Sequence, residues 1–191
     1  QLGAAKAIGT VLHGYDQQQG LGLVIDDVAA RNAIINMPGA YGLIPGQSYF
    51  DVTDDLLVSF DASETTSFFR DAYGNAINNA AELESFMIGA GDGRSAAGSA
   101  PERAAIANTS LVGQALDDRD ERLDTWTAPD GVGITEIIGV GLDTERGFEY
   151  REFGQWVCGI IGCARESIYK PVPRFTQFGD QTVVGESAEA Y

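Results

Sequence analysis

Short apolar runs, each closed by glycine, proline, aspartate or asparagine, constrain the fold of this chain more than any other feature. Four such runs occupy the beginning of the chain: residues 7–15, 21–27, 32–37 and 55–62. Runs of this length with turn residues between them are typical of strands. A Pro-Gly pair at Pro45 and Gly46 adds a further turn. The punctuation therefore predicts a mainly β fold, an antiparallel β-sandwich or barrel, rather than alternating β and α units.

Residues 68–107 follow a different pattern. Four apolar residues recur there at helical spacing: Leu83, Phe86, Met87 and Ala90. Candidate capping residues flank them: Asn75, Asn78 or Asn79 before the run, and Gly89 or Gly91 after it. Ser99 and Glu102 fit the capping box of a second short helix in a glycine-rich loop. We expect residues 68–107 to be an insertion with one or two short helices.

Strand signals return after residue 108. They occupy residues 109–116, 133–142, 148–161, 167–178 and 181–185. Pro171 and Pro173 restrict their segment to a sheet edge or an extended arm. We therefore expect a single β-rich domain over residues 1–191, in which residues 170–191 form an extended C-terminal arm.

A repeated pattern, an apolar pair, a glycine and then aspartate, appears as "LVGQALDD" and again as "IIGVGLD". It supplies carboxylates that hard cations favour: Asp117, Asp118, Asp120 and Asp143. The acidic run lacks the glycine-centred spacing of a calcium loop, and Arg119 and Arg122 interrupt it. We expect solvated turns at the ends of strands and no metal site. Convergence of Asp117 and Asp143 on one ion would contradict this interpretation.

Motifs for enzyme chemistry are absent from the sequence. His13 is the single histidine, and no Gly-x-Ser-x-Gly motif occurs. The glycine-rich stretch around Asp92 lacks the Lys-Ser/Thr pair of a phosphate loop and follows the expected helix. We expect no enzyme activity and no cofactor, with His13 in a strand or at an interface. A hydrolase that works through paired carboxylates is kept as an alternative.

Cys158 and Cys163 bracket the sequence "GIIG", which fits a tight hairpin. A hairpin of this kind brings the two sulfur atoms together, so a local disulfide is our first interpretation. A cross-link between subunits and two buried free thiols remain open. The two cysteines cannot form a zinc site, because the chain has one histidine and no other cysteine to complete the four ligands.

The charge of the chain excludes some partners. The sequence has 28 acidic residues against 12 basic ones, for a net charge of −16, which disfavours direct binding of nucleic acid or of anionic membranes. Only Lys6 and Lys170 are lysines. Many carboxylates with almost no lysine are typical of proteins from salt-adapted organisms, where salt screens self-repulsion. A GC-rich genome explains the arginine preference equally well.

The order of these features, Pro45-Gly46, then an insertion, then "VGQALD" at residues 112–117, resembles that of the small β-rich decoration, or cement, proteins on capsids of tailed viruses. The resemblance implies a trimer or similar symmetric homo-oligomer that binds viral capsid proteins at the particle surface. We therefore expect a virion structural protein of a salt-adapted host, with these interface residues: Trp156, Tyr169, Phe175 and Phe178. The alternatives are a jelly-roll capsid or tail-tube subunit, and a secreted carbohydrate- or surface-binding β-domain with an aromatic platform at Trp126 or Trp156.

Overall fold

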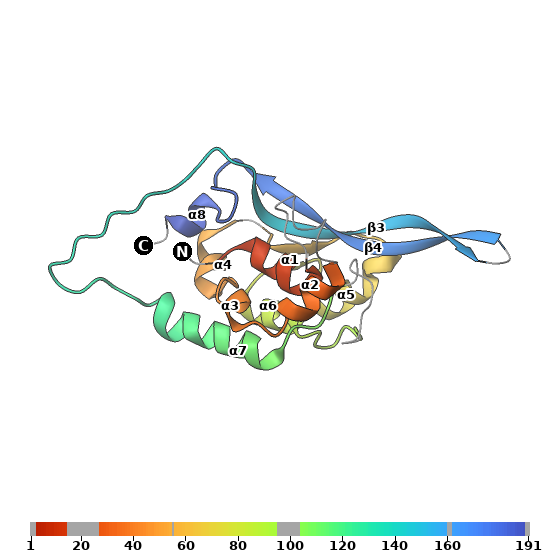
Figure 1. The fold of residues 1–191 in the computed structure, drawn as a ribbon, viewed down its shortest axis with the longest axis horizontal. Coiled ribbons are helices and arrows are strands. Elements are labelled where there is room, and N and C mark those ends of the chain that lie inside the picture. Colours follow the sequence, from red (N-terminus) through yellow and green to blue (C-terminus); the bar gives the residue numbers. More distant parts are fainter. Residues whose placement is uncertain (1–2, 15–26, 55, 95–103, 160–161, 190–191) are drawn as a thin grey trace.

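The computed structural model describes residues 3–14, 27–54, 56–94, 104–159 and 162–189. Over these residues the chain forms eight α-helices and one four-stranded mixed sheet (Figure 1). The expectation of a mainly β sandwich or barrel is therefore wrong, and the fold is α/β. The predicted strands that begin at residues 7 and 109 are helices instead, because each buries one face and does not alternate between two.

The helical body comes mainly from the first part of the chain. Its elements in order are α1 (Ala5–His13), α2 (Asp27–Ile34), α3 (Pro38–Tyr41), α4 (Gln47–Val52), β1 (Val58–Phe60), the 3-10 turn η2 (Glu64–Thr66), α5 (Ser67–Tyr73), β2 (Ala76–Ile77) and α6 (Ala80–Met87). The later elements are α7 (Thr109–Asp118), the π-helical turn η3 (Arg119–Leu123), β3 (Thr144–Gly159), β4 (Gly162–Thr176) and α8 (Gly185–Ala188).

Helix α1 corrects the first predicted strand. Ala5, Ile8 and Leu12 lie on one helical face and are fully buried. Gly14 ends the helix in the left-handed conformation, with φ 77°, that glycine adopts without strain. Residues 32–37, also predicted as a strand, belong to the end of α2 and the turn after it. The predicted strand at residues 55–62 contains β1, whereas residues 21–26 lie outside the described part of the chain.

The middle of the chain forms the helix that its spacing predicts. Asn79 begins α6, and its side chain accepts a 2.9 Å hydrogen bond from the backbone N–H of Glu82. Leu83, Phe86 and Met87 are all fully buried in the main core. The described residues of this region, 68–94 and 104–107, therefore contribute to the core, which differs from the expected insertion. The predicted second helix at Ser99 and Glu102 lies outside the described residues.

The sheet has the strand order β2-β1-β3-β4. Strand β1 runs parallel to β3 and pairs with it only from Phe148 to Tyr150. Strands β3 and β4 continue beyond this contact as a long antiparallel hairpin that projects from the body (Figure 1). Strand β4 lies at the edge of the sheet. Pro171 and Pro173 are tolerated there, because no further described strand pairs with the side of the backbone on which they lack an N–H group.

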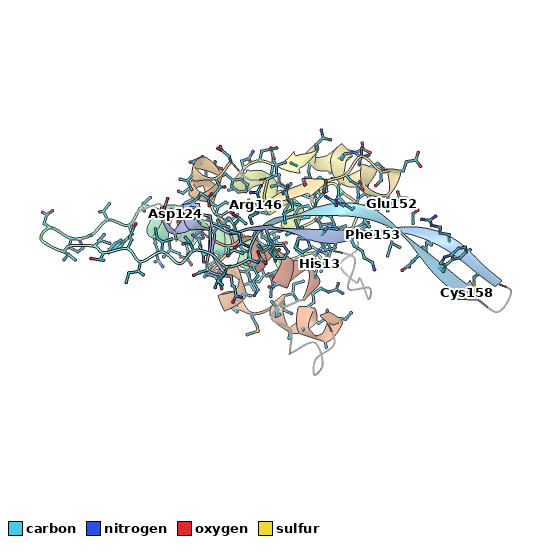
Figure 2. The ribbon with its side chains drawn as sticks, turned by 90° about the horizontal axis from the view of Figure 1, so that it is seen from above. His13, Asp124, Arg146, Glu152, Phe153 and Cys158 are labelled. Atoms are coloured by element: carbon cyan, nitrogen blue, oxygen red, sulfur yellow. A yellow bond between two sulfur atoms is a disulfide. The ribbon has the colours of Figure 1, made fainter. Side chains whose placement is uncertain are left out.

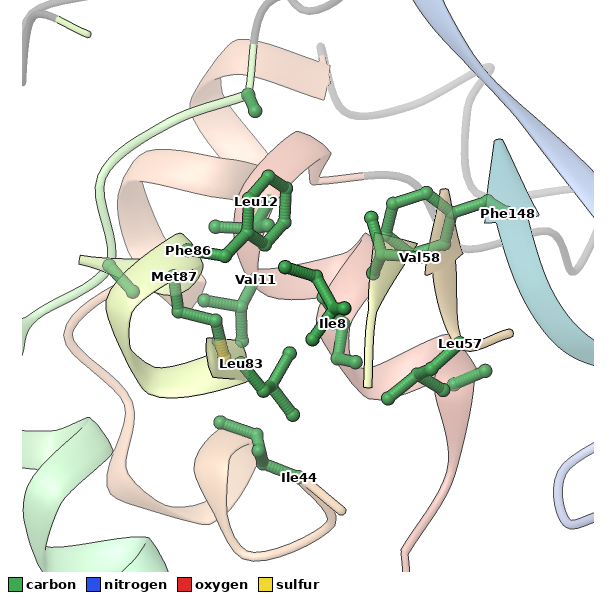
Figure 3. Packing of buried hydrophobic residues seen from close by; sticks show 14 of the residues in the cluster. Ile8, Val11, Leu12, Ile44, Leu57, Val58, Leu83, Phe86, Met87 and Phe148 are labelled. Carbon is green, nitrogen blue, oxygen red and sulfur yellow. The ribbon is translucent and has the colours of Figure 1, made fainter. Parts of the chain in front are cut away.

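The core lies between the helices and one face of the sheet. Side chains from α1, α6, β1 and β3 meet there, as Figure 3 shows for Leu12, Phe86, Val58 and Phe148. Tyr150 of β3 stands among aromatic rings that are 5.0 to 5.9 Å away between centroids: Phe60, Phe69, Phe86, Phe148 and Tyr169. These contacts fix β3, and with it the base of the hairpin, against the helical body.

The C-terminal residues do not form the extended arm that the sequence suggested. Residues 170–176 belong to β4, and a bridge between Gly179 and Val184 closes the turn that follows. Helix α8 packs back on the body, where the buried Ser187 hydroxyl donates a 2.9 Å hydrogen bond to the carbonyl of Gly3. The segment of this molecule that extends from the body lies earlier in the chain, between α7 and β3.

Candidate functional site

The first copy of the repeated pattern, "LVGQALDD", is helix α7 rather than a strand. Asn108 begins the helix, and its side chain accepts from the backbone N–H groups of Ser110 and Leu111. Val112 is buried, and Leu111, Ala115 and Leu116 pack against the core at helical spacing. The residues "VGQAL", on which the resemblance to decoration proteins rested, therefore do not form a strand. The Pro45-Gly46 pair leads into helix α4.

The candidate metal ligands have other roles in this structure. Asp117 and Asp118 end α7 and Asp120 lies in η3, where Asp118 forms an exposed 3.3 Å ion pair with Arg122. Asp143 precedes β3 and accepts a hydrogen bond from the Gln177 side chain. In the described ranges, no three histidine, cysteine, aspartate or glutamate residues are grouped so that they could hold a metal ion.

The second copy of the pattern lies in a segment that leaves the body. Residues 125–142, which we call the extended segment, run outward from η3 and return to the start of β3 (Figure 1). Six large apolar side chains in it are exposed: Trp126, Val132, Ile134, Ile137, Val140 and Leu142. Ile137 is 93% exposed. Exposed apolar residues concentrated in one segment are typical of interaction surfaces, whereas isolated ones are ordinary.

Residues 133–142, predicted as a strand, pair with no strand among the described residues. Gly141 and Leu142 donate backbone hydrogen bonds to the carbonyls of Gln177 and Gly179, at 2.8 and 3.3 Å. Within the described part of the chain, residues 133–140 form no backbone hydrogen bond at all. Their sequence is rich in isoleucine, valine and threonine, which favour strands. This stretch therefore has strand composition and an unpaired backbone.

A hollow of about 410 Å³ lies where the extended segment passes the turn before α8. Trp126, Ile134 and Ile137 line it from the extended segment, and Val183 lines it from the turn. Glu136 and Asp180 add two carboxylates. The close passage is possible because residue 139 is glycine: a Cβ atom there would lie 2.8 Å from Cβ of Asp180. The hollow therefore combines an apolar surface with negative charge.

The second exposed feature is the tip of the β3–β4 hairpin, of which residues 153–159 and 162–165 are described. Cys158 and Cys163 form a disulfide across a pair of directly opposed residues (Figure 2). Trp156 is opposed to Arg165, so both side chains lie on the same face as the disulfide. Trp156 is 72% exposed. Phe153 lies on the opposite face of the strand, because side chains alternate.

The four predicted interface residues differ in their surroundings. Trp156 and Phe175 are exposed. Tyr169 packs against the rings of Phe68 and Phe69, at 5.5 and 5.2 Å between centroids, and belongs to the core. The ring of Phe178 lies directly against Gly185 at the start of α8. Only the first two are therefore placed to contact another molecule.

Two buried titratable residues, His13 and Glu145, lie inside the body. His13 is fully buried in α1, where its Nε2 is 2.7 Å from the hydroxyl of Tyr150, and not in a strand or at an interface. Glu145 is 7% exposed. Burial raises the pKa of Glu145 to about 7, against the opposing influence of Lys6. Their burial separates both side chains from any dissolved substrate.

Sequence reasoning did not identify the residues that determine the charge and the apolar exposure of these surfaces. Arg165 was overlooked, although counting back from a disulfide between residues 158 and 163 places it opposite Trp156. Ile134 and Ile137 were assigned to a paired strand, because composition identifies strand-forming residues but not whether a partner strand exists. The absence of any basic residue from the extended segment was the available signal that its surface is acidic.

No protein-family model, curated protein or solved structure matches this chain. Among the described helices, none is both long and apolar enough to span a membrane. The function is therefore inferred from the two exposed surfaces and their chemistry.

Proposed function

We propose that this chain is a non-enzymatic structural subunit that assembles with other subunits in the shell of a virion. The observation that carries this proposal is the extended segment, which exposes six large apolar side chains and an unpaired strand-like backbone. A hairpin with an exposed tryptophan projects at the other end of the molecule (Figure 1). Surfaces of this kind act by the area that they bury against neighbouring subunits.

The free energy available from these surfaces favours association. Burying a side chain such as Ile137 against a partner contributes about 2 kcal/mol. Burial of several side chains of this type would contribute more free energy than the weak contacts of an ordinary protein surface. Left uncovered, an apolar segment with an unpaired backbone promotes aggregation. A subunit whose segment is covered in its assembly avoids that outcome.

Two further features support a particle outside the cell. The disulfide at the hairpin tip is of the kind that persists in oxidising surroundings. The net charge of −16 opposes close packing of subunits at low salt, and molar salt shortens the range of that repulsion to about 3 Å. We therefore propose an extracellular particle from a salt-rich setting as the site of assembly.

The alternatives fit the structure less well. A jelly-roll subunit requires two packed antiparallel sheets, whereas the described residues form one mixed sheet with helices. A carbohydrate-binding platform at Trp126 or Trp156 would rest on a single tryptophan, because Trp126 follows η3 and Trp156 lies on the hairpin, at opposite ends of the molecule. The decoration role itself now rests on the exposed surfaces and not on the resemblance.

The proposal is tested by measuring association in solution. Sedimentation velocity of the full chain in about 2 M NaCl should show species that grow with protein concentration. Replacing both Ile134→Ser and Ile137→Ser should raise the concentration needed for association by about tenfold or more, because exposed apolar area is lost. The matched control is Met37→Ser with Leu43→Ser, two exposed apolar residues on the body. This control should associate like the wild type.

A wild-type chain that stays monomeric at millimolar concentration in molar salt would overturn the proposal. The virion setting is tested separately, by fractionating particles from cultures that produce the chain and locating it by mass spectrometry. It should be recovered with particles that contain nucleic acid. Its absence from every such fraction would contradict the virion setting.

A further inference from the structure

We infer that the hairpin tip of one copy docks in the hollow of a second copy, with Trp156 seated in the hollow and Arg165 facing Glu136 and Asp180. This inference deepens the proposed function and rests on it, because it names the partner as another copy of this chain. It also names the contact as one between two different surfaces, the hairpin tip and the extended segment.

The chemistry of the hairpin tip suits such a contact. Trp156 and Arg165 stand side by side on one face, since they are directly opposed in the β3–β4 pairing. Both are exposed. Tryptophan and arginine are the residue types that most often dominate the free energy of protein interfaces. In the sequence from residue 153 to residue 165, Arg165 is the only charged residue, in a chain whose net charge is −16.

The hollow has the complementary chemistry. Its apolar lining, from Trp126, Ile134 and Ile137, fits a large aromatic ring, and its volume of about 410 Å³ is within the range that holds a small molecule. Glu136 and Asp180 supply carboxylates for a guanidinium. The extended segment contains two carboxylates, Asp130 and Glu136, and no lysine, arginine or histidine. The negative charge of the hollow therefore favours contact with the hairpin tip over contact with an acidic surface.

Backbone pairing adds to this contact. Beyond Glu152, whose backbone N–H donates a 2.9 Å hydrogen bond to the Asp61 side chain, no described strand pairs with the outer side of β3, so residues 153–158 form an open sheet edge. Residues 133–140 of another copy have strand composition and no backbone hydrogen bond within the described residues. Addition of this stretch to the open edge would satisfy both backbones. It would also bring Glu136 to the same hairpin that carries Arg165.

The two surfaces lie at opposite ends of one molecule, as Asp124 and Cys158 show in Figure 2. A hairpin therefore cannot reach the hollow of its own chain, and the contact joins one copy to the next. When subunits join through two unlike surfaces, the first and last subunits of a row each keep one surface uncovered. It therefore produces closed rings or continuing filaments, in place of a simple two-fold dimer.

The test is a charge exchange between the two surfaces. Arg165→Glu alone and Glu136→Arg alone should each weaken association by about tenfold or more, measured by sedimentation velocity at the lowest salt concentration where the wild type assembles. An equimolar mixture of the two variants should associate again. In the mixture each hairpin tip finds a segment of opposite charge, so the two variants alternate along the assembly.

A matched pair of variants separates the two faces of the hairpin. Trp156→Ser should weaken association by about tenfold or more, whereas Phe153→Ser, on the opposite face and 41% exposed, should have little effect. Far-ultraviolet circular dichroism checks that each variant is folded.

The outcomes distinguish this inference from the proposed function. If the wild type assembles and the mixture of charge variants does not recover, or if Trp156→Ser assembles normally, the docking contact is wrong and the structural role stands. If the wild type does not assemble in any salt, the proposed function fails first. A folded mixture that alternates Arg165→Glu and Glu136→Arg chains supports the contact between two copies.

Discussion

Glu145 shows at the residue scale how the body is built around the base of the hairpin. It lies in β3 close to Gly9 of α1, and its side chain is nearly excluded from water. Burial raises the pKa of this carboxyl to about 7, and the positive charge of Lys6 opposes the shift. The folded protein therefore holds this proton more tightly than the unfolded chain, in which the pKa is near 4.5.

The pH dependence that follows has a definite sign. Between about pH 4.5 and pH 7 the folded state binds more protons at Glu145, so this residue lowers the free energy of unfolding as the pH rises. Above pH 7 the loss is complete. Glu145→Gln should therefore raise the free energy of unfolding at pH 8 by about 1 to 3 kcal/mol and leave it unchanged at pH 4. Urea unfolding of both proteins at the two pH values checks this. An equal effect at both values would contradict the role of ionisation.

At the scale of elements, two glycines have opposite roles, one in a helix and one in a strand. Gly113 lies within α7 and faces open space, whereas a Cβ atom at Gly147 of β3 would lie 2.6 Å from the carbonyl oxygen of Leu56. Gly147 thus permits the close approach through which Phe148 donates a 3.0 Å hydrogen bond to the Leu57 carbonyl. One glycine weakens its helix, and the other is needed for the pairing of β3 with β1.

The same substitution should therefore have opposite effects at these positions. Gly113→Ala should raise the free energy of unfolding by about 0.5 to 1 kcal/mol, because alanine restricts the unfolded chain and favours the helix. Gly147→Ala should lower it by about 1 to 3 kcal/mol, because the backbone of β3 must move away. Thermal unfolding of both variants measures the difference. Destabilisation by Gly113→Ala would contradict the helical assignment of α7.

The elements that the sequence predicted correctly are those with a strong local signal. Helix α6 has its asparagine cap and its apolar spacing, and the runs at residues 148–161 and 167–178 overlap most of β3 and β4. Helices α1 and α7 were mistaken for strands because short apolar runs with glycine suit either structure until burial is known. The extended segment was mistaken for a paired strand because pairing is a tertiary property. Both exposed surfaces therefore needed the three-dimensional arrangement.

The whole molecule has a solid body and two exposed features at opposite ends. The body is held by the aromatic residues around Tyr150, and it positions the hairpin on one side and the extended segment on the other (Figure 1). In the assembly that we propose, the high negative charge opposes contact elsewhere, while apolar area and the Arg165 charge favour contact at the two ends. Assembly at these ends would cover the unpaired backbone of residues 133–140.

Hydrogen–deuterium exchange of the assembled wild-type chain, compared with the dilute monomer, tests this account most directly. We expect amides of residues 133–140 to exchange quickly in the monomer and at least about tenfold more slowly in the assembly, with a parallel change at residues 153–158. Amides of the body should exchange alike in both states. Equal exchange at residues 133–140 in monomer and assembly would show that the extended segment stays uncovered, and would contradict the central claim.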